Sequence, residues 1–172
     1  MMPLCLEASH PSSPNREVHL QRQLRGSMAR VVAHLYGKTK NQFCKGLISD
    51  YETRMEGRGV TVKHHSEKSK TPKEYEKYLI ELSGALILLD ENGKLQTSND
   101  FSSMCEQLIL GSKTVNFAIG PADGFSEEIK MAAPHILSLS KMTMPHELAT
   151  VVFLEQLYRT TEILRGSPYH RD

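Results

Sequence analysis

Residues 136–165 read ILSLSKMTMPHELATVVFLEQLYRTTEILR, and the rest of the chain is organised around this stretch. A short apolar run and a polar turn lead into a long helix, which we predict over 145–165. Pro145 is expected at the first helical position, where the N–H that proline lacks would have no helical partner. Apolar residues lie on two sides of this helix: Leu148, Val151, Val152 and Tyr158 on one, and Phe153, Leu154, Leu157 and Leu164 on the other.

A helix that covers one side of a sheet needs only one apolar stripe. Two stripes leave two interpretations of helix 145–165 open. In the first, one face packs on its own domain and the other meets a second chain. In the second, the helix is buried centrally within one domain.

Length and composition predict one soluble domain. The 172 residues are enough for a sizeable core, and 21 basic against 20 acidic residues give a net charge of +1. This balance does not indicate nucleic-acid binding by itself, although a local basic patch is compatible with it. No apolar run approaches the roughly 20 residues of a membrane helix. Cys5, Cys44 and Cys105 form no metal-ligand spacing, which predicts no metal site and a reducing compartment.

The first 27 residues differ in character from the rest. They are polar and contain several prolines, so residues 1–27 are interpreted as a disordered leader or a misassigned start, and 28–172 as a single domain. The leader lacks the apolar core of a secretory signal. It contains arginines and serines but also Glu7 and Glu17, which makes it a weak match to an organelle transit peptide. We therefore expect a cytoplasmic protein, or an organellar one if residues 1–27 are a transit peptide.

Strand-like and helix-like segments alternate along the domain. The pattern predicts strands at 29–36, 60–64, 85–89, 114–119 and 136–139, and helices at 41–55, 72–82, 98–110, 126–132 and 145–165. Such alternation is typical of an α/β domain, here with a mainly parallel sheet of five to six strands flanked by helices. The segment 90–93 (DENG) is expected to be a turn that ends the third strand.

Two of the helices have clear local signals. Thr71, Pro72 and Glu74 fit a capping box with proline in the first turn. The helix at 41–55 has one apolar face, formed by Phe43, Leu47, Ile48, Tyr51 and Met55.

Ligands of parallel α/β sheets bind at the carboxyl ends of the strands. Three predicted loops lie there: 90–94, 120–125 and 140–145. The second has Gly120 and Gly124 around Pro121, and glycine permits close approach of backbone to a ligand. A plain tight turn explains it equally well. It does not contain the GxGxxG or Walker patterns, so a dinucleotide or nucleoside triphosphate has no motif support.

The chain ends in GSPYHRD, an unusual set of side chains for a terminus. Tyr169, His170 and Arg171 would supply a stacking ring, a titratable imidazole and a phosphate-binding fork, although tails often have no function. His146, near a predicted helix start, is a candidate for orienting a loop. Structural roles are expected for the remaining histidines of the domain: His34, His64, His65 and His135. No Ser-His-Asp set can be assigned from spacing.

Three motifs give the chain a family resemblance. SLSKMTMPH (138–146), LEQLYR (154–159) and the closing PYHRD (168–172) resemble the ribosomal RNA large subunit methyltransferase H family, which belongs to the SPOUT class. The likeness extends over 28–172, with MARVVAHLYGK similar to the family's opening strand and turn. The resemblance implies a trefoil knot in the C-terminal part of the sheet and a homodimer formed through helices next to the knot.

The resemblance also implies an activity and a site. Members methylate N3 of a pseudouridine in helix 69 of large-subunit (23S) rRNA, within assembled ribosomes, with S-adenosyl-L-methionine as methyl donor. By motif position, the donor site is similar to Leu89, Gly120, Leu139, Ser140, Lys141, Met142, Thr143 and Met144. The tail residues Tyr169, His170 and Arg171 resemble the substrate-side, catalytic segment.

Two departures from the family pattern keep other functions open. Family members have two glycines where this chain has Gly120 and Pro121, and often an arginine where it has Thr150. A second hypothesis is therefore a ribosome-binding or assembly protein that has this fold and no transfer activity. A third is a small-molecule binding module of α/β fold that is unrelated to RNA.

Overall fold

The computed structural model describes residues 31–111 and 114–169. The expected leader 1–27, and His170 and Arg171 of the tail, lie outside these residues. In chain order the elements are β1 (Val31–Tyr36), α2 (Gln42–Met55), β2 (Val60–His65), α3 (Pro72–Ile80), β3 (Ala85–Leu95), α4 (Ser98–Gly111), β4 (Val115–Ile119), α5 (Glu127–Ala132), β5 (His135–Ser138) and α6 (His146–Leu164). The predicted alternation of strands and helices is confirmed.

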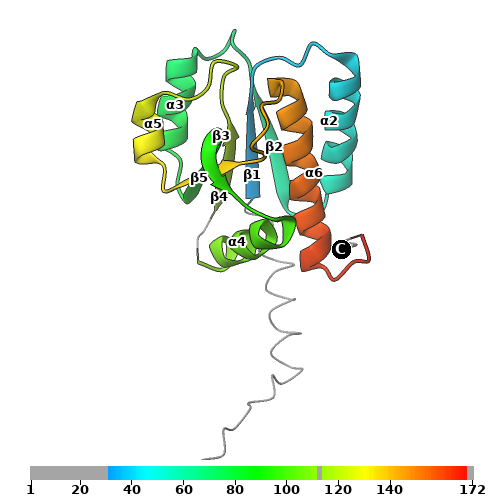
Figure 1. Cartoon of the computed structure of the whole chain (residues 1–172). Coiled ribbons are helices and arrows are strands. Elements are labelled where there is room, and N and C mark those ends of the chain that lie inside the picture. The colour runs from blue at the N-terminus through cyan, green and yellow to red at the C-terminus, as the bar shows by residue number, and fades with distance from the viewer. Residues whose placement is uncertain (1–30, 112–113, 170–172) are drawn as a thin grey trace, which may run out of the picture.

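One parallel sheet forms the centre of the domain. Its strand order is β2-β1-β4-β3-β5, and each neighbouring pair is parallel. Helices α2, α4 and α6 cover one face, and α3 and α5 cover the other (Figure 1). Strand β4 is buried throughout, with Val115, Phe117 and Ile119 in the first layer and Ala118 in the second. A strand covered on both faces is expected to have such a continuous apolar sequence.

Strand β3 is longer than predicted. Residues 90–93 do not end it, because the strand pairs with β5 on both sides of an irregularity: Leu89 and Lys94 are both in register with Leu137. Between them, Gly93 lies directly on the backbone of Leu137. The turn-like composition of 90–93 was therefore misleading, since it marks a bulge that bends one strand around its neighbour.

Helix α6 packs against both α2 and α4. The sequence predicted Pro145 as the first helical residue. In the structure it is the N-cap, and the helix begins at His146. Both apolar stripes are largely buried within the domain, because Val151 and Tyr158 are as inaccessible as Phe153 and Leu154. This burial favours the central-helix interpretation for most of α6. Only Leu148, at its N-terminal end, is a large exposed apolar residue of the helix.

The apolar face predicted for helix 41–55 is only half buried. Ile48 and Met55 of α2 are buried in the core of the domain, but Phe43 is 85% exposed and Leu47 is 46% exposed. The sequence predicted that these residues share a face, and the first two turns of that face extend past the edge of the core. The chain beside them is tied to α6, since the Glu147 carboxylate accepts bonds from the backbone N–H groups of Lys40 and Asn41.

A buried histidine pair lies under the other face of the sheet. Asn116 donates its Nδ2 to the Ser83 carbonyl, so its Oδ1 accepts a bond from His34 Nε2–H at 3.2 Å. Neutral His34 then accepts at Nδ1 from His65 Nε2–H at 3.1 Å. Burial is the largest cause that lowers the pKa of His34, and it lowers the pKa of His65 to about 4. Both imidazoles are therefore neutral in the fold.

This pair predicts acid sensitivity. The unfolded chain protonates His65 below its ordinary pKa of 6.5, whereas the folded chain resists protonation down to about 4. Stability is therefore expected to fall as the pH drops through this interval, because the unfolded state binds more protons. Urea unfolding at pH 7 and pH 5 measures the loss. His65→Phe retains the aromatic contacts with Tyr75 and Tyr78 and should lose less stability than the wild type, while His135→Gln should lose as much. An unchanged loss in His65→Phe would exclude His65 as the source.

Candidate functional site

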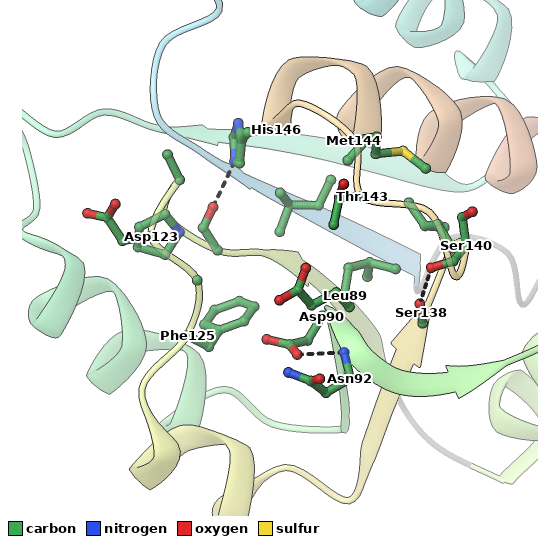
Figure 2. A pocket seen from close by; sticks show the side chains of 18 of the residues that line it. Leu89, Asp90, Asn92, Asp123, Phe125, Ser138, Ser140, Thr143, Met144 and His146 are labelled. Atoms are coloured by element: carbon green, nitrogen blue, oxygen red, sulfur yellow. Dashed lines mark hydrogen bonds between the residues drawn. The ribbon is translucent and has the colours of Figure 1, made fainter.

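A cleft of about 290 Å³ opens beside β3 where its pairing with β4 ends at Leu89, and at the carboxyl ends of β4 and β5. Its walls come from the bulged part of β3 around Asp90, from the segments after β4 and β5 around Gly120 and Ser140, and from His146 at the start of α6 (Figure 2). Small-molecule sites occupy roughly 300–1,000 Å³, so this cleft is at the lower end of that range. Parallel strands bring the three segments together because their carboxyl ends share one edge of the sheet.

The segment after β4 is held at several points. His146 Nε2 lies 2.8 Å from the Gly120 carbonyl oxygen. A Cβ at Gly120 would come within 3.0 Å of the Phe125 ring, so glycine is required for the ring to close over the backbone. At the far end, the Glu76 carboxylate accepts bonds from the N–H and hydroxyl of Ser126. The segment 120–126 is therefore fixed to α6 at its start and to α3 at its end.

The segment after β5 folds on itself through serine side chains. Ser138 Oγ donates to the Ser140 carbonyl at 2.9 Å, and Ser140 Oγ accepts from the Met142 N–H at 2.9 Å. These two bonds set the turn from which Thr143 and Met144 enter the wall of the cleft. Met142 lines the cleft too, although it is 79% exposed.

An ion pair lies in the wall below these segments. Lys130 Nζ of α5 is 3.1 Å from Asp90 Oδ2, and Asp90 Oδ1 accepts from the Asn92 N–H at 3.0 Å. The hydrogen bond to Asp90 is the largest cause that raises the pKa of Lys130. Glu91 and Asp123 line the cleft as exposed residues. The described lining residues include three carboxylates and one ammonium group. This excess of negative charge favours a ligand with positive charge.

Comparison with known proteins identifies the family. The family described as "Predicted SPOUT methyltransferase" matches residues 29–170. The chain belongs to the SPOUT methyltransferase family.

Two relatives of known name agree with this assignment, and one solved structure is reported beside them as a likeness only. Ribosomal RNA large subunit methyltransferase H of Coprothermobacter proteolyticus is 41% identical over 138 residues, covering 78% of this chain and 94% of that protein. The protein of the same name from Prochlorococcus marinus strain MIT 9303 is 38% identical over 154 residues, covering 88% and 98%. A crystal structure of a TrmH/SpoU tRNA modifying enzyme from A. aeolicus covers 91% of both chains, with 11% identity and a TM-score of 0.41.

The SPOUT fold accounts for the path of the chain around β3. The sheet is parallel and flanked by helices, as the resemblance implied. The pairing of β5 with both halves of β3 is consistent with the trefoil knot of the family. Strand spacing alone would not predict a knot, because true knots are almost absent from folds in general.

The structure brings most of the donor-side residues predicted from sequence into one cleft. These are Leu89, Gly120, Leu139, Ser140, Met142, Thr143 and Met144. Lys141 is exposed and is not part of the lining. The predicted loops 90–94 and 120–125 include Asp90 and Phe125, but sequence reasoning did not single out these side chains. It missed Lys130, since its ion pair with Asp90 joins distant elements and leaves no spacing pattern.

The tail residue Tyr169 lies elsewhere. Its ring stands edge-on against Tyr158 with centroids 5.0 Å apart, and the Arg159 guanidinium lies 5.1 Å from its centroid. These contacts are 12 to 13 helical residues from His146, or about 18–20 Å along α6 at 1.5 Å per residue. Figure 1 shows α6 running from the cleft end of the domain to the opposite end. Within one chain, Tyr169 and the cleft are thus separated.

Thr150, where relatives were expected to have arginine, is buried and donates its hydroxyl to the His146 carbonyl at 3.0 Å.

Within the described residues, no helix has the length and apolarity to cross a bilayer. The same residues contain no group of three His, Cys, Asp or Glu side chains that would hold a metal ion.

Proposed function

We propose that this chain transfers a methyl group from S-adenosyl-L-methionine to N3 of a pseudouridine in helix 69 of large-subunit (23S) rRNA, within assembled ribosomes. One observation carries the proposal: the bulge of β3 and the segments after β4 and β5 close a single cleft in a SPOUT methyltransferase fold. The substrate follows the relatives, whose name specifies large-subunit ribosomal RNA. The base, the atom and the stem-loop follow the motif resemblance. The site of action would be the compartment that contains the ribosomes.

The residues of the cleft suit this donor. Leu89, Ile119 and Leu139 offer apolar walls for an adenine. The carboxylates of Asp90 and Asp123 complement a sulfonium and an ammonium group. When bound, S-adenosyl-L-methionine supplies an electrophilic methyl group. The contribution of the chain is to orient it and to exclude water.

The substrate side is assigned to the tail: Tyr169, His170 and Arg171. The imide N–H of the base is a weak acid, and its anion is the better nucleophile. Positive charge from Arg171 would stabilise that anion and raise its concentration near neutral pH. His170 is a candidate to accept the proton, because its neutral form is abundant near pH 7. The Tyr169 ring would stack on a base.

A homodimer would unite the two halves of the site. The distance of Tyr169 from the cleft along α6 argues that the tail of one subunit serves the cleft of the other. A two-fold dimer in which the two α6 helices run antiparallel would bring the end of each to the start of its partner. Exposed apolar side chains at the N-terminal ends of α2 and α6 support an interface there: Phe43, Leu47 and Leu148. Closed two-fold dimers are the commonest soluble assembly.

The same arrangement would gather basic residues for RNA. Lys38 and Lys40 precede α2 at the cleft end of the domain, and Arg165 follows α6 at the other end. In an antiparallel dimer the Arg165 of one subunit would approach the lysines of its partner. Phosphate contacts from such a surface would make binding salt-dependent despite the small net charge.

A second candidate is a ribosome-binding protein that has lost transfer activity. Pro121, which lines the cleft, offers no N–H to a ligand there. Isothermal titration separates the two candidates. We expect S-adenosyl-L-methionine to bind with a dissociation constant in the micromolar range. No heat at protein concentrations well above micromolar would reject the donor, and with it the methyltransferase.

The target is tested in cells. Mass spectrometry of rRNA from a strain that lacks this protein should detect helix 69 without the N3 methyl group. A copy of the gene should restore the methyl group, and a copy encoding Gly120→Leu should not. Full methylation in the deletion strain would remove the proposed substrate.

A further inference from the structure

Two successive carbonyl groups at the end of β4 are each bound by a side chain. The Tyr75 hydroxyl of α3 lies 3.1 Å from the Ile119 carbonyl oxygen and 3.2 Å from that of His34. His146 Nε2 of α6 lies 2.8 Å from the Gly120 carbonyl oxygen. The two side chains approach from opposite faces of the sheet, since α3 and α6 cover different faces. The backbone that enters the cleft is therefore held from both sides.

The contact at Gly120 fixes the proton of His146. A carbonyl oxygen only accepts, so the imidazole nitrogen that faces it must be the donor. His146 is thus protonated at Nε2, and in the neutral ring Nδ1 has the lone pair. Figure 2 shows the bonded nitrogen directed to Gly120 and the rest of the ring at the upper edge of the cleft.

The sequence at this point makes an external contact necessary. Glycine has wide backbone freedom, so the ψ of Gly120 is poorly restricted by the residue itself. The following residue is Pro121, which has no N–H to anchor the peptide between them. The carbonyl of that peptide is its one hydrogen-bonding group, and His146 binds it.

We infer that His146 is a positioning residue of the donor cleft, which holds the Gly120–Pro121 peptide through an Nε2–H bond to the Gly120 carbonyl. It sets the wall against which the donor binds without touching the reacting atoms. The link to the donor rests on the proposed function, whereas the bond itself does not.

The first test measures affinity for S-adenosyl-L-methionine by isothermal titration. His146→Ala leaves the carbonyl without its donor and should weaken binding about 10-fold, the effect of about 1.4 kcal/mol. The amide of His146→Gln reaches the position of Nε2 and should stay within about 3-fold of wild type. His146→Asn places its amide near Nδ1 and should resemble alanine. Equal affinity in wild type and His146→Ala, or equal loss in the glutamine and alanine variants, would overturn the inference.

Thr150→Val is the matched control. It removes a hydroxyl bond to the His146 carbonyl within α6 and leaves the imidazole in place. Affinity should remain within about 2-fold of wild type. A loss as large as that of His146→Ala would mean that the start of α6 matters and the imidazole does not.

The second test needs no ligand and no variant that folds poorly. Nitrogen NMR of the imidazoles in the wild-type protein distinguishes the two neutral tautomers, and the His146 signals are assigned by their loss in His146→Gln. An Nε2–H ring with an unprotonated Nδ1 supports the bond to Gly120, and an Nδ1–H ring overturns it. If wild type has the Nε2–H tautomer yet binds no S-adenosyl-L-methionine, the positioning contact stands and the proposed function fails.

Discussion

Replacing Gly93 with alanine is expected to destabilise the fold by about 3 kcal/mol, at the upper end of the usual overpacking range. A Cβ at this position would lie 2.4 Å from the carbonyl carbon of Leu137 and 2.7 Å from its Cα. Both contacts are with backbone, which moves only if the β3–β5 pairing opens. A side chain would yield by changing rotamer, but the backbone of Leu137 is held by its pairing with β3.

Gly46→Ala is the control for this prediction. Gly46 lies inside α2, and a Cβ there would meet nothing within 4 Å. Alanine should therefore stabilise the fold by about 0.5–1 kcal/mol through helix propensity. Denaturant unfolding at one fixed protein concentration compares the two variants, because the proposed dimerisation would make stability concentration-dependent. If Gly93→Ala unfolds at the wild-type denaturant concentration, Gly93 does not lie against the Leu137 backbone as described.

The contrast between Gly93 and the capping box of α3 explains what could be predicted from sequence. Thr71 and Glu74 make their reciprocal bonds within four consecutive residues, so the helix start was visible locally and is confirmed. Gly93 touches Leu137, more than 40 positions away, and nothing near Gly93 in the chain indicates that partner. Local composition predicted a turn there, and tertiary pairing made it a bulge in a strand.

The cleft has the same division. Parallel topology alone predicts that the chain beyond Leu89, Ile119 and Ser138 meets at one edge of the sheet, and it does, although the part beyond Leu89 is a bulge within β3. The pairs that tie those segments down were not predictable: Asp90 with Lys130, and Ser126 with Glu76. Each pair joins two elements through side chains, and any of the 41 charged residues was an equal candidate beforehand. His146 was the exception, because its place at a helix start beside a loop already indicated an orienting role.

Exposure was the least predictable property. Phe43 and Leu47 continue the periodicity of Ile48 and Met55, yet they extend beyond the core. Periodicity reports that residues share a face and not how far the neighbouring layer reaches. The exposed pair belongs to the surface proposed for a second subunit, whereas the second stripe of α6, the original indication of a dimer, is mostly buried in its own domain.

Deleting residues 170–172 is expected to reduce methylation at least about 100-fold while S-adenosyl-L-methionine affinity stays at the wild-type value, since an interaction made only in the transition state is lost. A chain that ends at Tyr169 keeps the contacts of that ring with Tyr158 and Arg159, so α6 retains its packing. Single-turnover methylation of ribosomes and isothermal titration measure the two quantities. Undiminished methylation would separate the tail from the chemistry.

Mixed dimers then decide which cleft the tail serves. One subunit ends at Tyr169 and has an intact cleft; the other has a complete tail and Gly120→Leu, which pushes a side chain against the Phe125 ring. If each tail acts on its partner's cleft, a heterodimer has one complete site. A one-to-one mixture that exchanges freely should then recover about a quarter of wild-type activity in a two-fold dimer. If each tail acts on its own cleft, no heterodimer has a complete site and the mixture stays inactive. Tyr169 contacts Tyr158, which lies 12 helical residues from His146. This distance along α6 argues for recovery, because the three residues beyond Tyr169 span only about 10 Å when extended.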